Sequence, residues 1–200
     1  MTALPALRLL EVNTPLIWHW PHFLEVVGVL QRYGFNGLII HQQNILALLA
    51  RPSAHNKNLA IENLNHERES TLNYLQRVCH FCQSRQIQLW IQGEALPGDA
   101  KIKQKFPEFF LNDDTPTGDA LFLTRFYRDT VDEMLDALPD ISGVILSLQT
   151  PTVHPDQWKE SMKTLHRNLR LKGKKLVLRD YLDDSWPRRQ LQNTLNSLPN

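Results

Sequence analysis

Short apolar runs alternate with longer amphipathic stretches along this chain, and this alternation constrains its fold more than any other feature. Five runs have strand character: Leu7–Asn13, Asn36–His41, Ile87–Gln92, Gly143–Leu148 and Lys175–Tyr181. Apolar residues recur at helical spacing over Pro21–Tyr33, Ile61–Arg85, Leu121–Leu138, Pro155–Leu171 and Pro187–Leu198, and Gln43–Ala50 is a short helical candidate. Strands separated by helices favour parallel β/α units with right-handed crossovers. We therefore expect one α/β domain over residues 1–200.

Two architectures fit this pattern. Five strands suffice for an open, doubly wound sheet, whereas a (β/α)8 barrel takes about 250 residues, so this chain would supply about five of its strand–helix units. The longest irregular stretch, residues 93–118, follows the third strand, and loops of this length are usually functional or disordered. Counting strands favours the open sheet.

Composition and motifs exclude several classes of function. The chain has 22 basic and 21 acidic residues without a basic stripe, which argues against nucleic-acid binding. No run approaches 18 apolar residues and the start lacks signal-peptide character, so we expect a cytoplasmic protein without a membrane partner. No GxGxxG, GxxxxGK or GxSxG motif occurs. We therefore expect no cofactor.

The cysteines and histidines do not predict a metal site. Cys79 and Cys82 are spaced as CxxC but fall inside an apolar helical pattern, where buried core cysteines are the expected state. His19 and His22 have no matched acidic residue nearby to complete a set of ligands.

Residues 29–41, VLQRYGFNGLIIH, resemble the passage from helix one to strand two of barrel glycoside hydrolases, in particular α-glucuronidases and hexosaminidases. Residues 105–109, KFPEF, resemble the "yPE" stretch after strand three of these enzymes. Residues 126–146 resemble the passage from helix three to strand four, and residues 174–181, KKLVLRDY, resemble a fifth strand that ends in arginine. The resemblance implies an incomplete TIM-like (β/α)8 barrel that binds or cleaves carbohydrate.

The chain departs from the family pattern after the fourth strand. There the α-glucuronidases have a Ser-Glu pair whose glutamate is the general acid, whereas this chain reads Leu148–Gln149–Thr150–Pro151 without a carboxylate. The resemblance therefore implies a fold and a class of substrate without supplying a catalytic pair.

Polar residues at the strand ends are the candidates for chemistry, because functional groups of barrels gather there. Glycosidic hydrolysis normally needs two carboxyl groups, for which Glu94 and Asp180 are our candidates, although both could instead serve loops or surface charges. Trp18 and Trp20 could stack on a sugar or instead pack the entry to the first helix. The candidates for hydrogen bonds to sugar, with Arg179 also suited to a uronic-acid carboxylate, are Asn13, His41, Gln92, Gln149 and Arg179.

Three functions remain open. The first is a glycoside hydrolase. The second is a non-catalytic or truncated barrel that binds sugar or a partner chain, since a homo-oligomer or a partner would be needed to cover bare strand edges. The third is an open-sheet α/β protein with a small ligand at the carboxyl ends of its strands.

Overall fold

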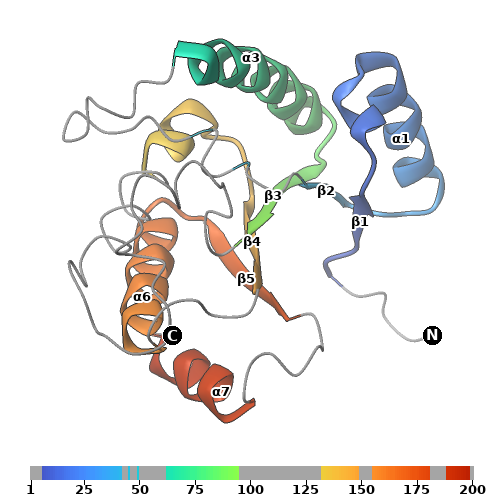
Figure 1. The fold of residues 1–200 in the computed structure, drawn as a ribbon. Coiled ribbons are helices and arrows are strands. Elements are labelled where there is room, and N and C mark those ends of the chain that lie inside the picture. Colours follow the sequence, from blue (N-terminus) through green and yellow to red (C-terminus); the bar gives the residue numbers. More distant parts are fainter. Residues whose placement is uncertain are drawn as a thin grey trace, which may run out of the picture.

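A computed structural model describes residues 6–41, 45, 49, 62–94, 132–148, 155–180 and 188–198. Its five strands coincide with the five predicted runs: β1 (Leu9–Val12), β2 (Gly37–His41), β3 (Gln88–Glu94), β4 (Gly143–Leu148) and β5 (Lys175–Asp180). The helical elements are η1 (Pro15–Trp18), α1 (Trp20–Arg32), α3 (Glu62–Ser84), α6 (Pro155–Leu171) and α7 (Arg188–Ser197), with a further helical segment at residues 132–137 (Figure 1).

The strands form one parallel sheet in the order β1-β2-β3-β4-β5. Each strand therefore pairs with the next strand along the chain, and the direction of winding never reverses. A doubly wound sheet needs such a reversal. The doubly wound alternative is therefore wrong for this chain, and the strands form a singly wound open sheet among the described residues.

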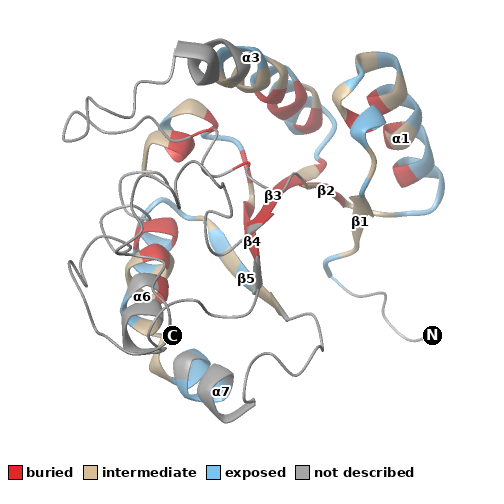
Figure 2. Ribbon diagram, in the orientation of Figure 1, coloured by how far each residue is buried: buried red, intermediate tan, exposed pale blue. Residues whose placement is uncertain are grey.

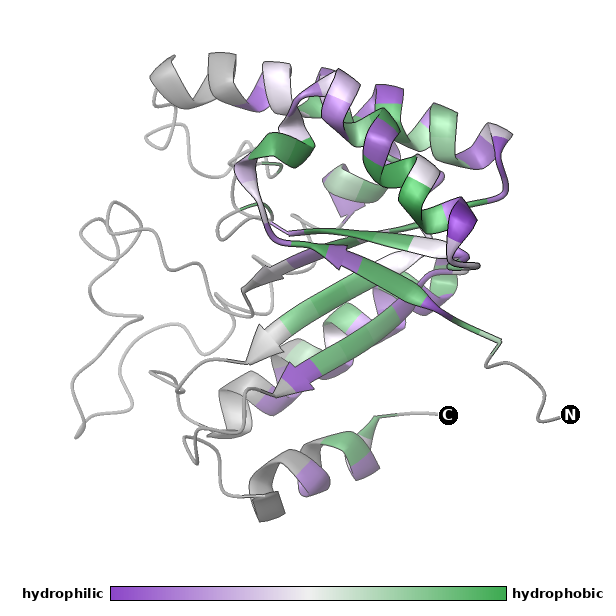
Figure 3. Cartoon of the chain, turned by 90° about the vertical axis from the view of Figure 1, so that its right-hand side faces the viewer, coloured by the Kyte–Doolittle hydropathy of each residue, from purple (hydrophilic) through white to green (hydrophobic). Residues whose placement is uncertain are grey.

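One face of the sheet, here called the helix face, carries the main apolar layer. Its residues alternate with those of the opposite face, and the layer joins Ile40, Ile91 and Leu146 of the strands to Phe23 of α1 and Leu165 of α6. Residues of α3 and of the 132–137 segment belong to the same layer, so these helices all cover one face (Figure 1). Figure 2 shows the buried residues in the strands and on the inner sides of the helices, and Figure 3 shows the strands as predominantly hydrophobic.

The opposite face, here called the Trp90 face, has its own small apolar cluster. Ile39, Trp90 and Ile145 are buried in it, and Leu9 packs against them. Trp90 is fully buried and lies against Gly143, where an added Cβ would overlap the carbonyl oxygen of Lys175 and approach Cζ3 of Trp90 to 2.6 Å. Glycine at position 143 therefore makes room for the indole ring across β4.

Local sequence signals explain where α1 and α6 stop. Gly34 follows α1 with φ of +72°, and Gly173 follows α6 with φ of +70°. Glycine adopts this left-handed conformation without the steric cost that a side chain would add. At the start of η1, the Thr14 side chain accepts a hydrogen bond from the Leu16 backbone N–H at 3.4 Å and so caps this short helix.

Cys79 and Cys82 are free thiols buried within the apolar layer, which confirms their expected state. Burial raises the pKa of each thiol to about 12. Both therefore stay protonated near neutral pH, which makes them poor nucleophiles and metal ligands.

Two of the predicted helices lie only partly within the residues that the structure describes. Residues 45 and 49 of Gln43–Ala50 are helical, and of Leu121–Leu138 only the part from residue 132 lies within the described residues. No helix in the described part of the chain is long and apolar enough to cross a membrane.

Candidate functional site

Three polar side chains from β1, β3 and β5 meet on the Trp90 face. The Arg179 guanidinium donates through Nη1 to Oε2 of Glu11, forming an ion pair, and to Oε1 of Gln92 at 3.2 Å. Nε2 of Gln92 in turn lies 3.5 Å from Oε1 of Glu11, the long limit for a hydrogen bond. These residues, here called the Glu11–Gln92–Arg179 cluster, bring together a carboxylate, an amide and a guanidinium.

Gln92 is the buried member of the cluster. It is fully buried, whereas the side chains of Glu11 and Arg179 are 26% and 37% exposed. A buried amide needs partners for both its oxygen and its nitrogen, and Arg179 and Glu11 supply them. Gln92 therefore holds both charged side chains from the buried side of the cluster. The Glu11 and Arg179 side chains each remain partly exposed to solvent.

The ion pair shows that the sheet curls around the Trp90 face. Glu11 and Arg179 belong to the two outermost strands, with three strands between them. In a flat sheet with strands about 4.8 Å apart, β1 and β5 would lie roughly 19 Å apart. Glu11 and Arg179, standing side by side on a flat sheet, could not bridge that distance, so curvature must bring their tips together.

The register adds a stagger to this curvature. Glu11 pairs with Ile39, Ile39 with Trp90, Trp90 with Gly143, and Gly143 with Lys175. The row of paired residues that starts at Glu11 therefore ends at Lys175 on β5. The ion-pair partner of Glu11 is nevertheless Arg179, four residues further along β5 than Lys175. The contact therefore joins two residues that lie four positions apart when the register is followed across the sheet.

Trp90 lies two residues before Gln92 on the same face and leaves one polar atom without a partner. Its indole Nε1 is buried and has no hydrogen-bond acceptor among the described residues. Because Cε3 and Cζ3 of the ring face Gly143, the N–H on the opposite edge is directed away from β4. A buried donor of this kind calls for an acceptor, which an oxygen of a water or a ligand could supply.

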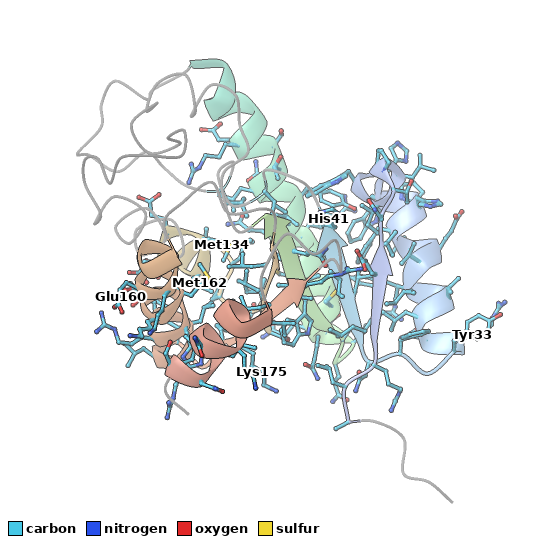
Figure 4. The ribbon with its side chains drawn as sticks, turned by 60° about the horizontal axis from the view of Figure 1, so that its bottom comes forward. Tyr33, His41, Met134, Glu160, Met162 and Lys175 are labelled. Atoms are coloured by element: carbon cyan, nitrogen blue, oxygen red, sulfur yellow. The ribbon has the colours of Figure 1, made fainter. Side chains whose placement is uncertain are left out.

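The remaining predicted binding residues on β1 and β2 lie near the same end of the sheet. His41 ends β2, is partly exposed and pairs in register with Gln92 (Figure 4). Asn13 follows β1 and is exposed. Neither makes a described hydrogen bond to the cluster. In the same view Lys175 marks the start of β5, and Met134, like Met162 of α6, is buried in the helix-face layer.

Trp18 and Trp20 are engaged with α3 rather than with the cluster. The ring of Trp18 lies 5.5 Å from that of Tyr74, whose hydroxyl donates to the carbonyl oxygen of Ile17. The ring of Trp20 lies 5.5 Å from that of Phe81, edge to face, and the Arg77 guanidinium stands 3.6 Å from its centroid. These contacts join the start of α1 to α3 and account for both rings without a sugar.

The two predicted catalytic carboxyls stand at strand ends. The backbone of Glu94 ends β3 in register with Ser147, which pairs with Arg179, and Asp180 ends β5 in register with Leu148. The side chains of Glu94 and Asp180 lie outside the described part of the structure, as does the whole of Gln149. Their roles therefore stay predictions.

Glu11 stands near the end of the first strand, but it was not selected as a candidate from the sequence. It lies inside a strand between Leu10 and Val12, on the Trp90 face. A charged residue inside a short apolar strand was the available signal, because such charges are seldom buried without a partner. Its partner could not be identified, since Arg179 is 168 residues away in the sequence.

The described residues contain no group of three or more histidines, cysteines and acids that could hold a metal ion. His22 instead forms an exposed contact within α1, with 3.1 Å between its Nδ1 and Oε2 of Glu25.

Comparison with known proteins finds a likeness among solved structures. No protein-family model and no curated protein sequence matches the chain. Among solved structures, the chain is similar to a GH138 enzyme targeting pectin rhamnogalacturonan II, with a TM-score of 0.63 and 12% sequence identity. The match covers 98% of this chain and 24% of that one, so the chain spans about a quarter of that structure's length. The likeness supports a glycoside-hydrolase-like fold; the narrower α-glucuronidase or hexosaminidase assignment stays a prediction.

Proposed function

We propose that this chain is a glycoside-hydrolase-like protein that binds or cleaves carbohydrate at the carboxyl ends of its strands. The Glu11–Gln92–Arg179 cluster is the observation that carries the proposal. It gathers hydrogen-bond donors and acceptors from three strands, at the end of the sheet where barrel enzymes hold their substrates. The likeness to a GH138 enzyme supports carbohydrate as the class of ligand.

We also propose that the sheet is part of a (β/α)8 barrel. In such a barrel eight strands share a shear of eight residues, or one residue per strand. Four steps from strand to strand lead halfway round the barrel, so the first and fifth strands face each other across its interior. Over these four steps the register shifts by four residues. The pairing of Glu11 with Arg179, four residues beyond the row of Glu11, supports this geometry.

For catalysis we keep Glu94 and Asp180 as the proposed carboxyl groups. The position of Glu94 supports its role, because Glu94 occupies the same row of the sheet as Arg179. Asp180 is the residue after Arg179, and consecutive strand residues belong to opposite faces, so its role requires that the chain turn at the end of β5. Glu11 is a third carboxyl group at this end of the sheet.

The test combines binding and turnover. The purified chain is titrated with a panel of monosaccharides, methyl glycosides and uronic acids, and its thermal midpoint is followed. A ligand that binds only the folded protein adds about 2.7 kcal/mol of stability at a hundredfold excess over its Kd. If no sugar shifts the midpoint, the proposal fails.

Turnover is measured with chromogenic glycosides of the sugars that bind. If Glu94 and Asp180 are the acid–base pair, Glu94→Gln and Asp180→Asn each lower kcat by about 10²–10⁴-fold while the midpoint shift with sugar remains. A chain that binds sugar but turns over none of these substrates is the second candidate, a non-catalytic carbohydrate-binding protein. The absence of a carboxylate in Leu148–Gln149–Thr150–Pro151 favours that candidate over the enzyme.

A further inference from the structure

We infer that the Glu11–Gln92–Arg179 cluster selects a neutral sugar that presents two adjacent hydroxyl groups, rather than a uronic acid. This inference rests on the proposed function, since it names the class of carbohydrate that the same site takes. It also gives Arg179 a different role from the one its residue type suggested, which was to pair with the carboxylate of an acidic sugar.

The first argument is the charge of the cluster. The Arg179 guanidinium already has a carboxylate partner in Glu11, so this pair has no formal net charge. A uronate approaching Arg179 would either lie beside the Glu11 carboxylate or displace it. Two carboxylates in one site repel each other, and a displaced Glu11, only 26% exposed, would be a partly buried charge without its partner.

The second argument is the complement of donors and acceptors. An ionised carboxylate only accepts hydrogen bonds, a guanidinium only donates them, and an amide does both. A sugar hydroxyl does both as well. Of two adjacent hydroxyl groups, one can donate to Glu11 while its neighbour accepts from Arg179, and the ion pair does not have to open. Hydrogen bonds to charged groups are stronger than neutral ones, so a ligand without charge can still bind.

The third argument is the way in which the pair is held. Gln92 is fully buried, and its amide contacts Arg179 at 3.2 Å and Glu11 at 3.5 Å. The two charged groups are therefore positioned by a residue that cannot move without losing both contacts. Groups fixed in this way recognise a ligand that hydrogen-bonds to both without moving them better than one that must separate them.

The unpartnered indole N–H of Trp90 is a separate observation on the same face. It is a buried donor without an acceptor among the described residues. Because the indole ring is fully buried, a water held beside it is the acceptor that fits this donor. Such a water would extend the polar network of the Trp90 face beneath the cluster.

The experiment compares sugars that differ only at carbon 6. Methyl α-galactoside and methyl α-glucoside are titrated into the full chain by calorimetry, each beside the corresponding methyl uronoside. We expect the neutral member of at least one pair to bind about tenfold more tightly than its uronate. A uronate that binds more tightly than its neutral counterpart would overturn the inference and leave the proposed function standing.

A variant then tests whether Glu11 causes the selection. Glu11→Gln removes the negative charge that lies beside Arg179 and would repel a uronate, so the preference should move toward the uronate by about tenfold and this gain should shrink at high salt. The control is Glu25→Gln, the same change in an exposed glutamate that contacts His22 within α1, which should leave the preference unchanged. An unchanged preference in folded Glu11→Gln would also overturn the inference.

The remaining outcomes are distinguishable. If neither the neutral sugar nor the uronate of any pair binds to wild type or variant, the proposed function fails together with the inference. Circular dichroism establishes that the variant is folded, and the wild-type comparison still decides the inference if Glu11→Gln does not fold.

Discussion

The carboxylate of Glu11 on β1 pairs with the guanidinium of Arg179 on β5, although three strands of the same sheet lie between them. This contact ties the two edges of the sheet together across the Trp90 face. It therefore reports the curvature of the sheet as well as the composition of the candidate site.

The first prediction concerns the energy of this pair. In a double-mutant cycle with Glu11→Gln and Arg179→Met, we expect a coupling of about 1 kcal/mol in the free energy of unfolding, because both groups are partly exposed and solvent screens their attraction. Urea unfolding of the four proteins measures it. Additive effects of the two substitutions would mean that the pair does not form in solution.

The second prediction concerns Trp20. Trp20→Leu should lower the free energy of unfolding by about 2 kcal/mol, because it removes the ring contacts with Phe81 and Arg77. It should leave sugar affinity unchanged, since these contacts tie α1 to α3. A variant of normal stability with a weakened sugar complex would restore Trp20 to the binding site.

The third prediction uses two glycines with different surroundings. Gly143→Ala should destabilise the fold by about 1–3 kcal/mol, because the new methyl group meets the Lys175 carbonyl and the Trp90 ring. The matched control is Gly28→Ala within α1, where nothing lies within 4 Å of the added Cβ. There we expect a gain of about 0.5–1 kcal/mol from helix propensity. Equal effects in thermal unfolding would contradict the close packing at Gly143.

The fourth prediction concerns alkaline pH. The folded thiols of Cys79 and Cys82 have a pKa of about 12 against 9.0 for a free thiol. Below pH 9 the thiols are protonated in both the folded and the unfolded protein, so the free energy of unfolding does not depend on them. Above pH 9 the thiols of the unfolded chain lose protons that the folded chain retains. The free energy of unfolding should therefore fall by up to about 1.4 kcal/mol per pH unit for each thiol.

The double variant Cys79→Ala/Cys82→Ala is the control for this pH dependence. Between pH 9 and 11 its stability should fall less steeply than that of the wild type. A residual slope above pH 10 is expected from Tyr74, whose pKa burial raises from 10.0 to about 12. Identical slopes for the two proteins would show that the thiols are accessible in the folded state.

Local signals were sufficient to predict the elements of the fold. Apolar runs located the five strands, and the apolar helical pattern around Cys79 and Cys82 predicted their burial. Each of these features depends on residues close together in the sequence. The choice between a doubly wound and a singly wound sheet depends on strand order, which local patterns do not encode.

The site was only partly predictable for the same reason. Gln92 and Arg179 were expected at strand ends, and they do meet. Glu11 was not selected as a candidate because its role depends on the curvature of the whole sheet, which brings β1 opposite β5. The proximity of Trp18 and Trp20 to the first strand suggested sugar stacking, but their packing depends on Tyr74 and Phe81 of a distant helix.

The central claim is that carbohydrate binds at the Glu11–Gln92–Arg179 cluster, and the most direct measurement is a titration of the ¹⁵N-labelled chain with sugar, followed by amide NMR. We predict saturable shifts concentrated at the carboxyl ends of β1, β3 and β5, around Glu11, Gln92 and Arg179, with the amides of α1 and α6 unmoved. Shifts that are absent, never saturate, or fall mainly on the helices would contradict the claim.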